Sequence, residues 1–185
     1  KINDITKNIK ELGTYPGASK FMALCGGGHD GSNSNVIDEF NMITAGNATD
    51  FGDLVTARSG CSSNSSNIRI LWSGGETSSN FSQQDYVHFA TKGNAADFGN
   101  LTAARRALAG LSSDTRGVFG GGREGSVVNK IEYITIASVG NATDFGDLNT
   151  SAATTERGSA ASTTRGIFAG FNQVPSVVND IDYIT

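Results

Sequence analysis

Three short stretches of this sequence place oxygen-bearing side chains at a spacing of three residues. They comprise Asn47, Asp50 and Asp53, then Asn94, Asp97 and Asn100, then Asn141, Asp144 and Asp147. Carboxylate and amide oxygens are the ligands that a hard cation such as calcium prefers. The same side chains also hold turns, because they accept hydrogen bonds from nearby backbone amides. The middle stretch has one carboxylate fewer, so we favour the turn role and predict no metal site and no cofactor.

Two further motifs are typical of enzymes but lack the context that their chemistry needs. Residues 120–125 fit the dinucleotide pattern G-x-G-x-x-G, which requires a helix at the glycines, yet the residues after them have the pattern of a strand. The kinase triplet Asp-Phe-Gly occurs three times, whereas a kinase uses one. His29 and His88 fall at unrelated positions, and no Ser-His-Asp set stands out. We therefore predict that the protein is not an enzyme.

Three arginines, Arg69, Arg116 and Arg165, each begin a strand that runs into a glycine cluster. A ring of guanidinium groups could clamp an anion or an acidic sugar. Salt bridges, or hydrogen bonds to carbonyls of a neighbouring unit, are the alternative. We favour this alternative because Met22 interrupts the ring at the fourth position.

The elements that must position these residues form a repeat. The nonapeptide Gly-Asn-Ala-(Thr/Ala)-Asp-Phe-Gly-(Asp/Asn)-Leu occurs at 46–54, 93–101 and 140–148, so successive copies are 47 residues apart. A fixed period of this size is typical of supersecondary units that stack on one another to bury their apolar faces.

Each unit has the pattern of four short strands. A strand before the glycine cluster is expected at 21–25, 68–72, 117–119 and 166–168, and a second one, after a polar loop, at 36–43, 85–90, 129–137 and 179–185. The nonapeptide makes a turn and a short outer strand. A strand rich in Ala and Ser follows, as at 103–111, and its small residues suit the narrow centre of a propeller. The sequence therefore predicts an all-β fold, a β-propeller.

The composition excludes several classes of partner. Of 185 residues, 24 are glycine and only 17% are charged, which argues against long helices. The net charge is −4, so no basic surface favours nucleic acid. No apolar run approaches the roughly 20 residues that span a bilayer, so we expect no membrane insertion. Cys25 and Cys61 are expected to be buried free thiols that act as small hydrophobes.

We predict one propeller domain over 1–185, most simply of four blades. The blades would cover about 10–54, 57–101, 104–148 and 152–185, the last completed by residues 2–7, which align with the outer strand at 49–54. Pairing of residues 2–7 beside 179–185 would close the ring and remove free strand edges. The alternative is a slice of a longer array with five to seven blades.

The repeat resembles the kelch repeat over most of the chain. Kelch blades have paired glycines after a strand, a Tyr in the following strand and an Arg before the next inner strand. Here these features are Gly74-Gly75 with Tyr86, Gly121-Gly122 with Tyr133, and the arginines Arg58 and Arg105. The chain departs from the family where kelch has a Trp after the Tyr strand, because Asn-Ala-Thr-Asp-Phe-Gly stands there instead.

The repeated phrase is similar to kelch-like repeats in virion proteins of bacteriophages, cyanophages especially, where they tend to belong to tail fibres or other surface appendages. This resemblance implies a non-enzymatic structural or receptor-contacting module, located on the virion or otherwise extracellular. Its partners would be other virion or appendage proteins, a host-surface glycan or further copies of the chain. A secreted lectin-like propeller is the alternative, and a carbohydrate-active enzyme comes third.

The loops after the glycines vary most between units, at 29–35, 76–83, 123–128 and 172–177. Variable loops on a repeated scaffold are where recognition normally resides. Their polar and small residues suit sugar hydroxyls, and two phenylalanines offer aromatic platforms. The candidate ligand-binding residues are His29, Asp30, Glu76, Phe81, Arg123, Glu124, Phe171 and Asn172.

Overall fold

The computed structural model describes residues 21–149, 158–173 and 176–185, and this part of the chain contains fourteen strands. The strands are β1 Met22–Gly26, β2 Val36–Asn41, β3 Thr49–Asp53, β4 Ser62–Ser65, β5 Arg69–Ser73, β6 Gln83–His88, β7 Ala96–Asn100, β8 Ala109–Ser112, β9 Arg116–Gly120, β10 Lys130–Thr135, β11 Thr143–Asp147, β12 Gly158–Ala161, β13 Gly166–Gln173 and β14 Ser176–Ile184. Within the described residues, no helix is long and apolar enough to cross a membrane.

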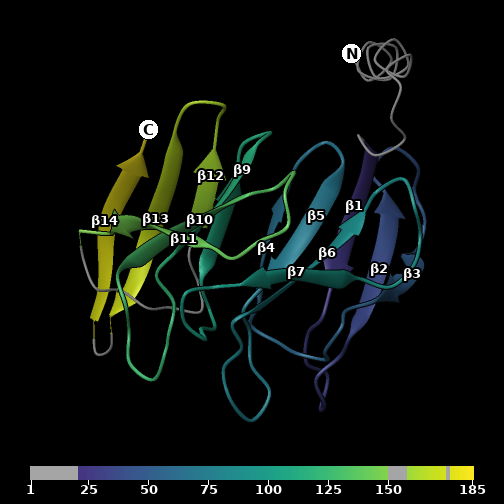
Figure 1. Cartoon of the computed structure of the whole chain (residues 1–185), viewed down its shortest axis with the longest axis horizontal. Helices are drawn as coiled ribbons and strands as arrows, with labels where there is room; N and C mark the ends of the chain where they lie inside the picture. The colour runs from purple at the N-terminus through teal and green to yellow at the C-terminus, as the bar shows by residue number, and fades with distance from the viewer. Residues whose placement is uncertain (1–20, 150–157, 174–175) are drawn as a thin grey trace.

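The strands form four antiparallel sheets in chain order (Figure 1). The first sheet is β1-β2-β3, the second β4-β5-β6-β7, the third β8-β9-β10-β11 and the fourth β12-β13-β14. Neighbouring strands in each sheet are consecutive in the chain, so every sheet is a simple meander of one repeat unit. The all-β prediction is confirmed.

The strands lie close to their predicted positions, with two exceptions. β8 begins only at Ala109, and β13 continues as far as Gln173.

The pairing between the second strand and the outer strand has the same irregularity in the first three sheets. Gly52, Gly99 and Gly146 pair normally, but the preceding Phe of each Asp-Phe-Gly has no partner, which makes a bulge in β3, β7 and β11.

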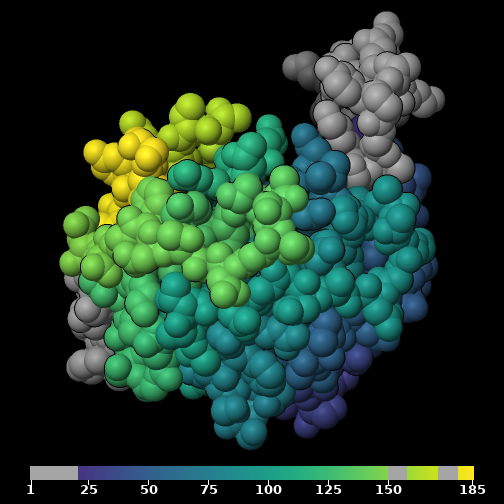
Figure 2. All heavy atoms as spheres, in the orientation of Figure 1, coloured from purple at the N-terminus to yellow at the C-terminus, as the bar shows by residue number. Residues whose placement is uncertain are grey.

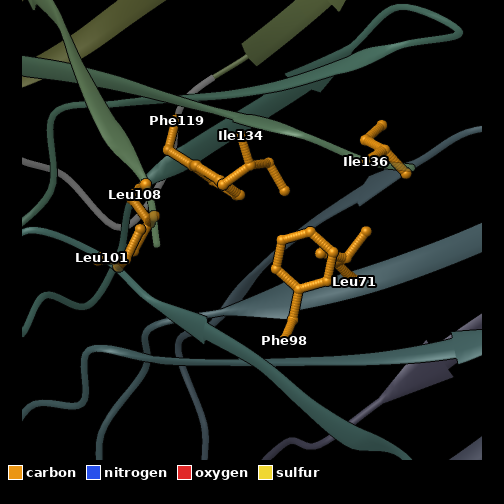
Figure 3. Packing of buried hydrophobic residues seen from close by; sticks show 8 residues of the cluster. Leu71, Phe98, Leu101, Leu108, Phe119, Ile134 and Ile136 are labelled. Atoms are coloured by element: carbon orange, nitrogen blue, oxygen red, sulfur yellow. The ribbon is translucent and has the colours of Figure 1, made fainter. Parts of the chain in front are cut away.

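The core lies between successive sheets. Between the second and third sheets, Leu71 and Phe98 face Phe119, Ile134 and Ile136 (Figure 3). Similar clusters join the first sheet to the second and the third to the fourth. Stacking therefore buries the apolar face that each sheet exposes alone, which is the dominant stabilising effect in such arrays.

The inner strands β4, β8 and β12 lie against one another, where the units converge. The small residues expected there are needed for this approach. A Cβ atom on Gly110 would lie 2.3 Å from Ser62 Oγ and 2.8 Å from the Ser63 carbonyl oxygen.

The first and fourth sheets lie at opposite ends of the described structure (Figure 1). Within the described residues, the sheets therefore form an open series rather than a closed ring. The predicted closing strand at 2–7 lies outside the described residues, so four-bladed closure stays a prediction.

The open end of the first sheet explains one wrong prediction. Cys25 is exposed, whereas its counterparts Trp72, Phe119 and Phe168 are buried against the preceding sheet. No sheet precedes the first one among the described residues, so nothing there covers the thiol. Cys61 is partly buried, its Sγ 3.8 Å from the Gly26 carbonyl oxygen, and both thiols are free.

The two thiols should therefore differ in reactivity. Burial raises the pKa of Cys61, so little of its reactive thiolate is present at neutral pH. In the native protein, we expect an aromatic disulfide reagent to modify Cys25 at least about tenfold faster than Cys61. A Cys25→Ser variant should keep only the slow phase, and urea should accelerate it. Equal native rates for both thiols would contradict this arrangement.

Candidate functional site

The loops that follow the glycine pairs are compact and similar in the first three sheets. Each is closed by a backbone bond to its second glycine, from Ser34 to Gly28, from Phe81 to Gly75 and from Val128 to Gly122, at 3.0, 2.8 and 3.1 Å. Gly74 shows why glycine is required, since its φ is 67° and a Cβ atom there would lie 2.4 Å from the Arg105 carbonyl oxygen.

These loops are bonded to one another in a row. Asn33 Nδ2 donates to the Glu76 carbonyl at 3.3 Å. One unit later, Asn80 Nδ2 donates to the carbonyls of Arg123 and Glu124 at 2.8 and 3.1 Å. The glycine-following loops of the first three sheets thus form one continuous surface, which we call the loop face.

An open groove of about 510 Å³ crosses the loop face between the second and third sheets. Its lining is mainly polar and charged and consists of Glu76, Ser78, Ser79, Asn80, Ala104, Arg106, Arg123, Glu124 and Gly125. Hydroxyl, amide and guanidinium groups at one groove are suited to a polar ligand such as a sugar.

Both carboxylates of the groove are paired with cations. Glu76 forms an ion pair with Arg106, and Glu124 lies 3.2 Å from Lys130 Nζ. These pairs are about one-third exposed, so they stabilise the fold by about 1 kcal/mol at most. Arg123 is exposed and its Nε donates to the Gly125 carbonyl at 3.4 Å. Arg123 is therefore the cation of the groove best placed to meet an incoming acceptor.

The structure brings three of the eight predicted ligand-binding residues together at this groove, namely Glu76, Arg123 and Glu124. His29 and Asp30 are exposed in the loop of the first sheet, where His29 Nδ1 lies 3.2 Å from Asn33 Oδ1. Phe81 is half-buried at the end of its loop, and its carbonyl accepts a hydrogen bond from the Arg105 amide. These three residues do not line the groove.

The fourth predicted loop, at 172–177, is wrong in part. Phe171 and Asn172 belong to β13 and pair with Val178 and Val177 of β14. In the first and second sheets, a Cβ atom on Gly27 or Gly74 would lie 2.7 or 2.4 Å from a carbonyl oxygen of the next unit, but a Cβ atom on Gly170 would meet nothing within 4 Å. The hairpin is free to continue there, and its β-branched residues favour the strand.

Sequence reasoning missed Arg106 and Asn80. Arg106 had a usable signal, because the preceding unit has Ser59 at the same position, so this charge departs from the repeat. Asn80 also had a signal, because Asn33 occupies the same position one unit earlier, and both side chains bond a carbonyl of the following loop.

The three repeated arginines stack on tyrosines. Arg69, Arg116 and Arg165 lie over the rings of Tyr86, Tyr133 and Tyr183, with 5.0, 4.5 and 5.1 Å between guanidinium carbon and ring centroid. Arg69 also donates to the Ile136 carbonyl of the next sheet at 3.1 Å. The expected bond to a neighbouring carbonyl is thus confirmed for Arg69, and the stacking was not foreseen.

The repeated asparagines hold neighbouring units together. Asn94 Oδ1 accepts from the Asp53 amide at 3.1 Å, and Asn141 Oδ1 from the Asn100 amide at 3.0 Å. Asp97 Oδ1 accepts from the Gly99 amide at 3.3 Å. Asp97 thus has the local turn-holding role that we favoured, whereas the two asparagines bond an amide of the preceding unit instead. In the described part of the chain, no group of three or more His, Cys, Asp or Glu residues is arranged to hold a metal ion.

Arg58 and Arg105, which precede the inner strands β4 and β8, are buried ion-pair partners. Arg58 lies 3.0 Å from Asp85 and Arg105 lies 2.6 Å from Glu132, and all four side chains are fully buried. Desolvation raises the pKa of Asp85 and of Glu132, and the adjacent guanidinium opposes the rise. Each arginine lies in the connection just before the inner strand, β4 or β8, and its acidic partner lies in β6 or β10 of the same sheet. The ion pair therefore attaches this connection to the sheet.

The fold therefore defines a class of repeat protein, an array of stacked antiparallel sheets with a polar loop face. No protein-family model matches the chain, and no curated protein matches it.

Proposed function

We propose that this chain is a non-enzymatic, kelch-like propeller module that contacts receptors or partner proteins in a phage virion appendage. The loop face carries the proposal, because it presents polar groups on a repeated scaffold. The carboxylates at its groove are each held by a cation and thus poorly suited to glycoside hydrolysis, which needs an acid and a base at one bond.

Recognition at the groove would use hydrogen bonds. Ser78, Ser79 and Asn80 can bond sugar hydroxyls, and Arg123 can bond an acidic or hydroxyl-bearing group. Single sites of this kind are open and weak, so several copies on one appendage would act together through avidity. A secreted lectin-like propeller is the second candidate. The hydroxyl-rich lining of the groove supports it, and it requires that the isolated chain bind a defined glycan.

The finer architecture is part of the same proposal. Four blades closed by residues 2–7 would need the first and fourth sheets to meet, whereas these sheets lie at opposite ends in Figure 1. The open series fits the alternative of five to seven blades better. Truncation of residues 1–9 distinguishes the two, since a closed ring should lose thermal stability on truncation and an open series should not.

Adsorption of the purified chain to candidate host cells, with a glycan array alongside, tests the function. We expect saturable binding that Arg123→Glu weakens at least about tenfold, because the change places a carboxylate where a cation meets the ligand. Asp114→Ala, which changes an exposed carboxylate between β8 and β9, at the end of β9 opposite the loop face, is the matched control and should bind as the wild type does.

Replacement of residues 76–83 or 123–128 should abolish adsorption altogether. Absence of binding to every cell and glycan would contradict the receptor role and favour a purely structural part. Binding that Arg123→Glu leaves unchanged would place recognition elsewhere.

A further inference from the structure

Two arginines lie directly opposite each other at the groove of the loop face, which runs along the lower edge of the molecule in Figure 2. The Arg106 amide donates to the Arg123 carbonyl at 3.2 Å, and the Arg123 amide donates to the Arg106 carbonyl at 2.9 Å. Residues that exchange both backbone bonds in this way are direct cross-strand neighbours. Like charges on such neighbours repel each other and destabilise the pairing.

The preceding unit shows that the loop does not need this pair of cations. There Ser59 and Glu76 occupy the same two positions, and they exchange the same backbone bonds at 3.1 and 2.8 Å. The bridge therefore forms with a hydroxyl and a carboxylate in place of two guanidinium groups. The arginines are a departure of this one groove from the repeat.

The backbone next to Arg106 is strained. Ala107 has φ of 54° and is the one non-glycine residue with a positive φ in the described part of the chain. One unit earlier Gly60 has the same conformation, at φ of 65°, without steric strain. Strain of this kind persists only where surrounding contacts impose it, and it is concentrated at active sites and ligand clamps. The third sheet is thus entered through Arg-Ala where the second is entered through Ser-Gly.

Cations outnumber carboxylates around the groove. Glu76 pairs with Arg106, and Glu124 pairs with Lys130. Arg123 forms no ion pair among the described residues, and its one side-chain hydrogen bond there uses Nε, so its two Nη groups are available to an acceptor. One positive charge is therefore uncompensated, and a single carboxylate would balance it.

The Glu76 carboxylate shows which chemical group fits beside these arginines. It reaches Arg106 Nη1 from the neighbouring loop, and both side chains of this ion pair are about one-third exposed. Such a pair stabilises the fold by about 1 kcal/mol at most, so an incoming carboxylate can displace Glu76. The groove thus contains its own competitor, which neutralises Arg106 while no ligand is bound.

We propose that Arg106 and Arg123 together bind one carboxylate of an acidic sugar, a uronic or a sialic acid, in competition with Glu76. Guanidinium groups present paired N–H donors that match the two oxygens of a carboxylate. Ser78 and Ser79 are exposed at the same groove and can bond the sugar hydroxyls. This ligand class rests on the proposed function, which places recognition at the same groove.

Titration of the isotope-labelled full chain with sodium glucuronate, followed by NMR, tests the proposal. We expect saturable shifts of the amide signals of residues 106 and 123–125. The affinity for glucuronate should be at least about tenfold higher than for its methyl ester, which lacks the charge. The same titration with N-acetylneuraminate and its methyl ester distinguishes the two sources of the carboxylate. Binding of either acid supports the proposal and assigns the source, whereas binding of neither overturns it.

Two variants test the roles of the arginine pair and of the competitor. Arg106→Ser introduces the residue of the preceding unit, so the fold should tolerate it, and it should weaken binding of the acid at least about tenfold. Glu76→Gln removes the competing carboxylate and should tighten binding about threefold. An increase in affinity on loss of a groove residue is not expected from a merely structural role.

Lys92→Ser and Glu39→Gln are the matched controls, because they remove the same charges from a surface ion pair outside the groove. Both should leave the affinity unchanged, and the amide spectra should show that every variant folds. The proposal would be overturned by equal binding of an acid and its ester, by wild-type affinity in Arg106→Ser, or by weaker binding in Glu76→Gln. Acetate that binds as tightly as the sugar acids would reduce the groove to a general anion site and overturn the acidic sugar.

The result is independent of the test of the proposed function. Neutral sugars that shift the same amides as strongly as the acids would overturn the acidic class and leave recognition at the groove intact. Binding of an acid without adsorption to any host cell would contradict the receptor role and leave the arginine site intact.

Discussion

Arg105→Ala should destabilise the protein by about 3–5 kcal/mol, because it leaves Glu132 as a buried charge without its partner. Arg105 Nη2 lies 2.6 Å from Glu132 Oε2, and Arg105 Nη1 donates to the carbonyls of Gly121 and Lys130 at 2.9 and 3.3 Å. The substitution therefore removes the counter-ion and also the donor for two backbone acceptors. Urea unfolding at neutral pH measures the loss, which is a large share of the stability of an ordinary domain.

Acid pH should reduce this loss. Desolvation holds the pKa of Glu132 in the folded protein above its unfolded value. A carboxyl group whose pKa is higher in the folded than in the unfolded protein stabilises the fold at pH values below its pKa in the unfolded protein. This stabilisation is lost as the pH rises through its pKa in the folded protein. Without Arg105 the folded pKa rises further, so the difference between variant and wild type should narrow from neutral pH toward pH 4.

Two variants serve as controls for the buried pair. Arg105→Met combined with Glu132→Leu removes both charges and should recover most of the stability, since apolar residues of similar size often replace a buried pair without loss. Lys92→Ala breaks the more exposed pair with Glu39 and should cost about 1 kcal/mol or less. If Arg105→Ala reduced the free energy of unfolding no more than Lys92→Ala does, the buried pair would not stabilise the sheet as its contacts indicate.

Gly99→Ala should be much more damaging than the same substitution at Gly146, which is the matching position one unit later. Gly99 has φ of 141°, and a Cβ atom there would meet the Gly140 carbonyl carbon and oxygen at 2.6 and 2.4 Å. Alanine at such a φ costs about 1–3 kcal/mol from the backbone alone. Displacing residues 140–142, whose amides bond to β7, adds about 1–3 kcal/mol for overpacking. Thermal and urea unfolding report the sum.

Gly146→Ala is the internal reference for this prediction. Gly146 has φ of 137° in the same motif, but no atom lies within 4 Å of its added Cβ. It should show the backbone cost only, so the difference between the two variants isolates the close approach of the next sheet. Equal losses for Gly99→Ala and Gly146→Ala would mean that residues 140–142 move aside freely and place no steric constraint on β7.

The location of the candidate site could be predicted from the sequence, but the full set of residues that line it could not. Glu76, Arg123 and Glu124 were predicted because they occupy the variable loops of a regular repeat. Arg106 was not, because it lies in the connection before an inner strand and reaches the groove only when the third sheet packs on the second. The prediction for Phe171 and Asn172 was wrong for the opposite reason. A loop was expected there by analogy with the other units, but these residues form a strand, because no neighbouring backbone constrains them.

The sequence by itself determined the repeat unit, the order of its strands and the positions that must be glycine. These features follow from local periodicity and from the backbone angles that only glycine adopts easily, and both depend on residues close in the chain. Only the tertiary structure decided which groups meet between units. Arg105 joins Glu132, Asn141 caps β7 and Cys25 is exposed because of how sheets stack, and stacking is set by contacts between residues far apart in sequence.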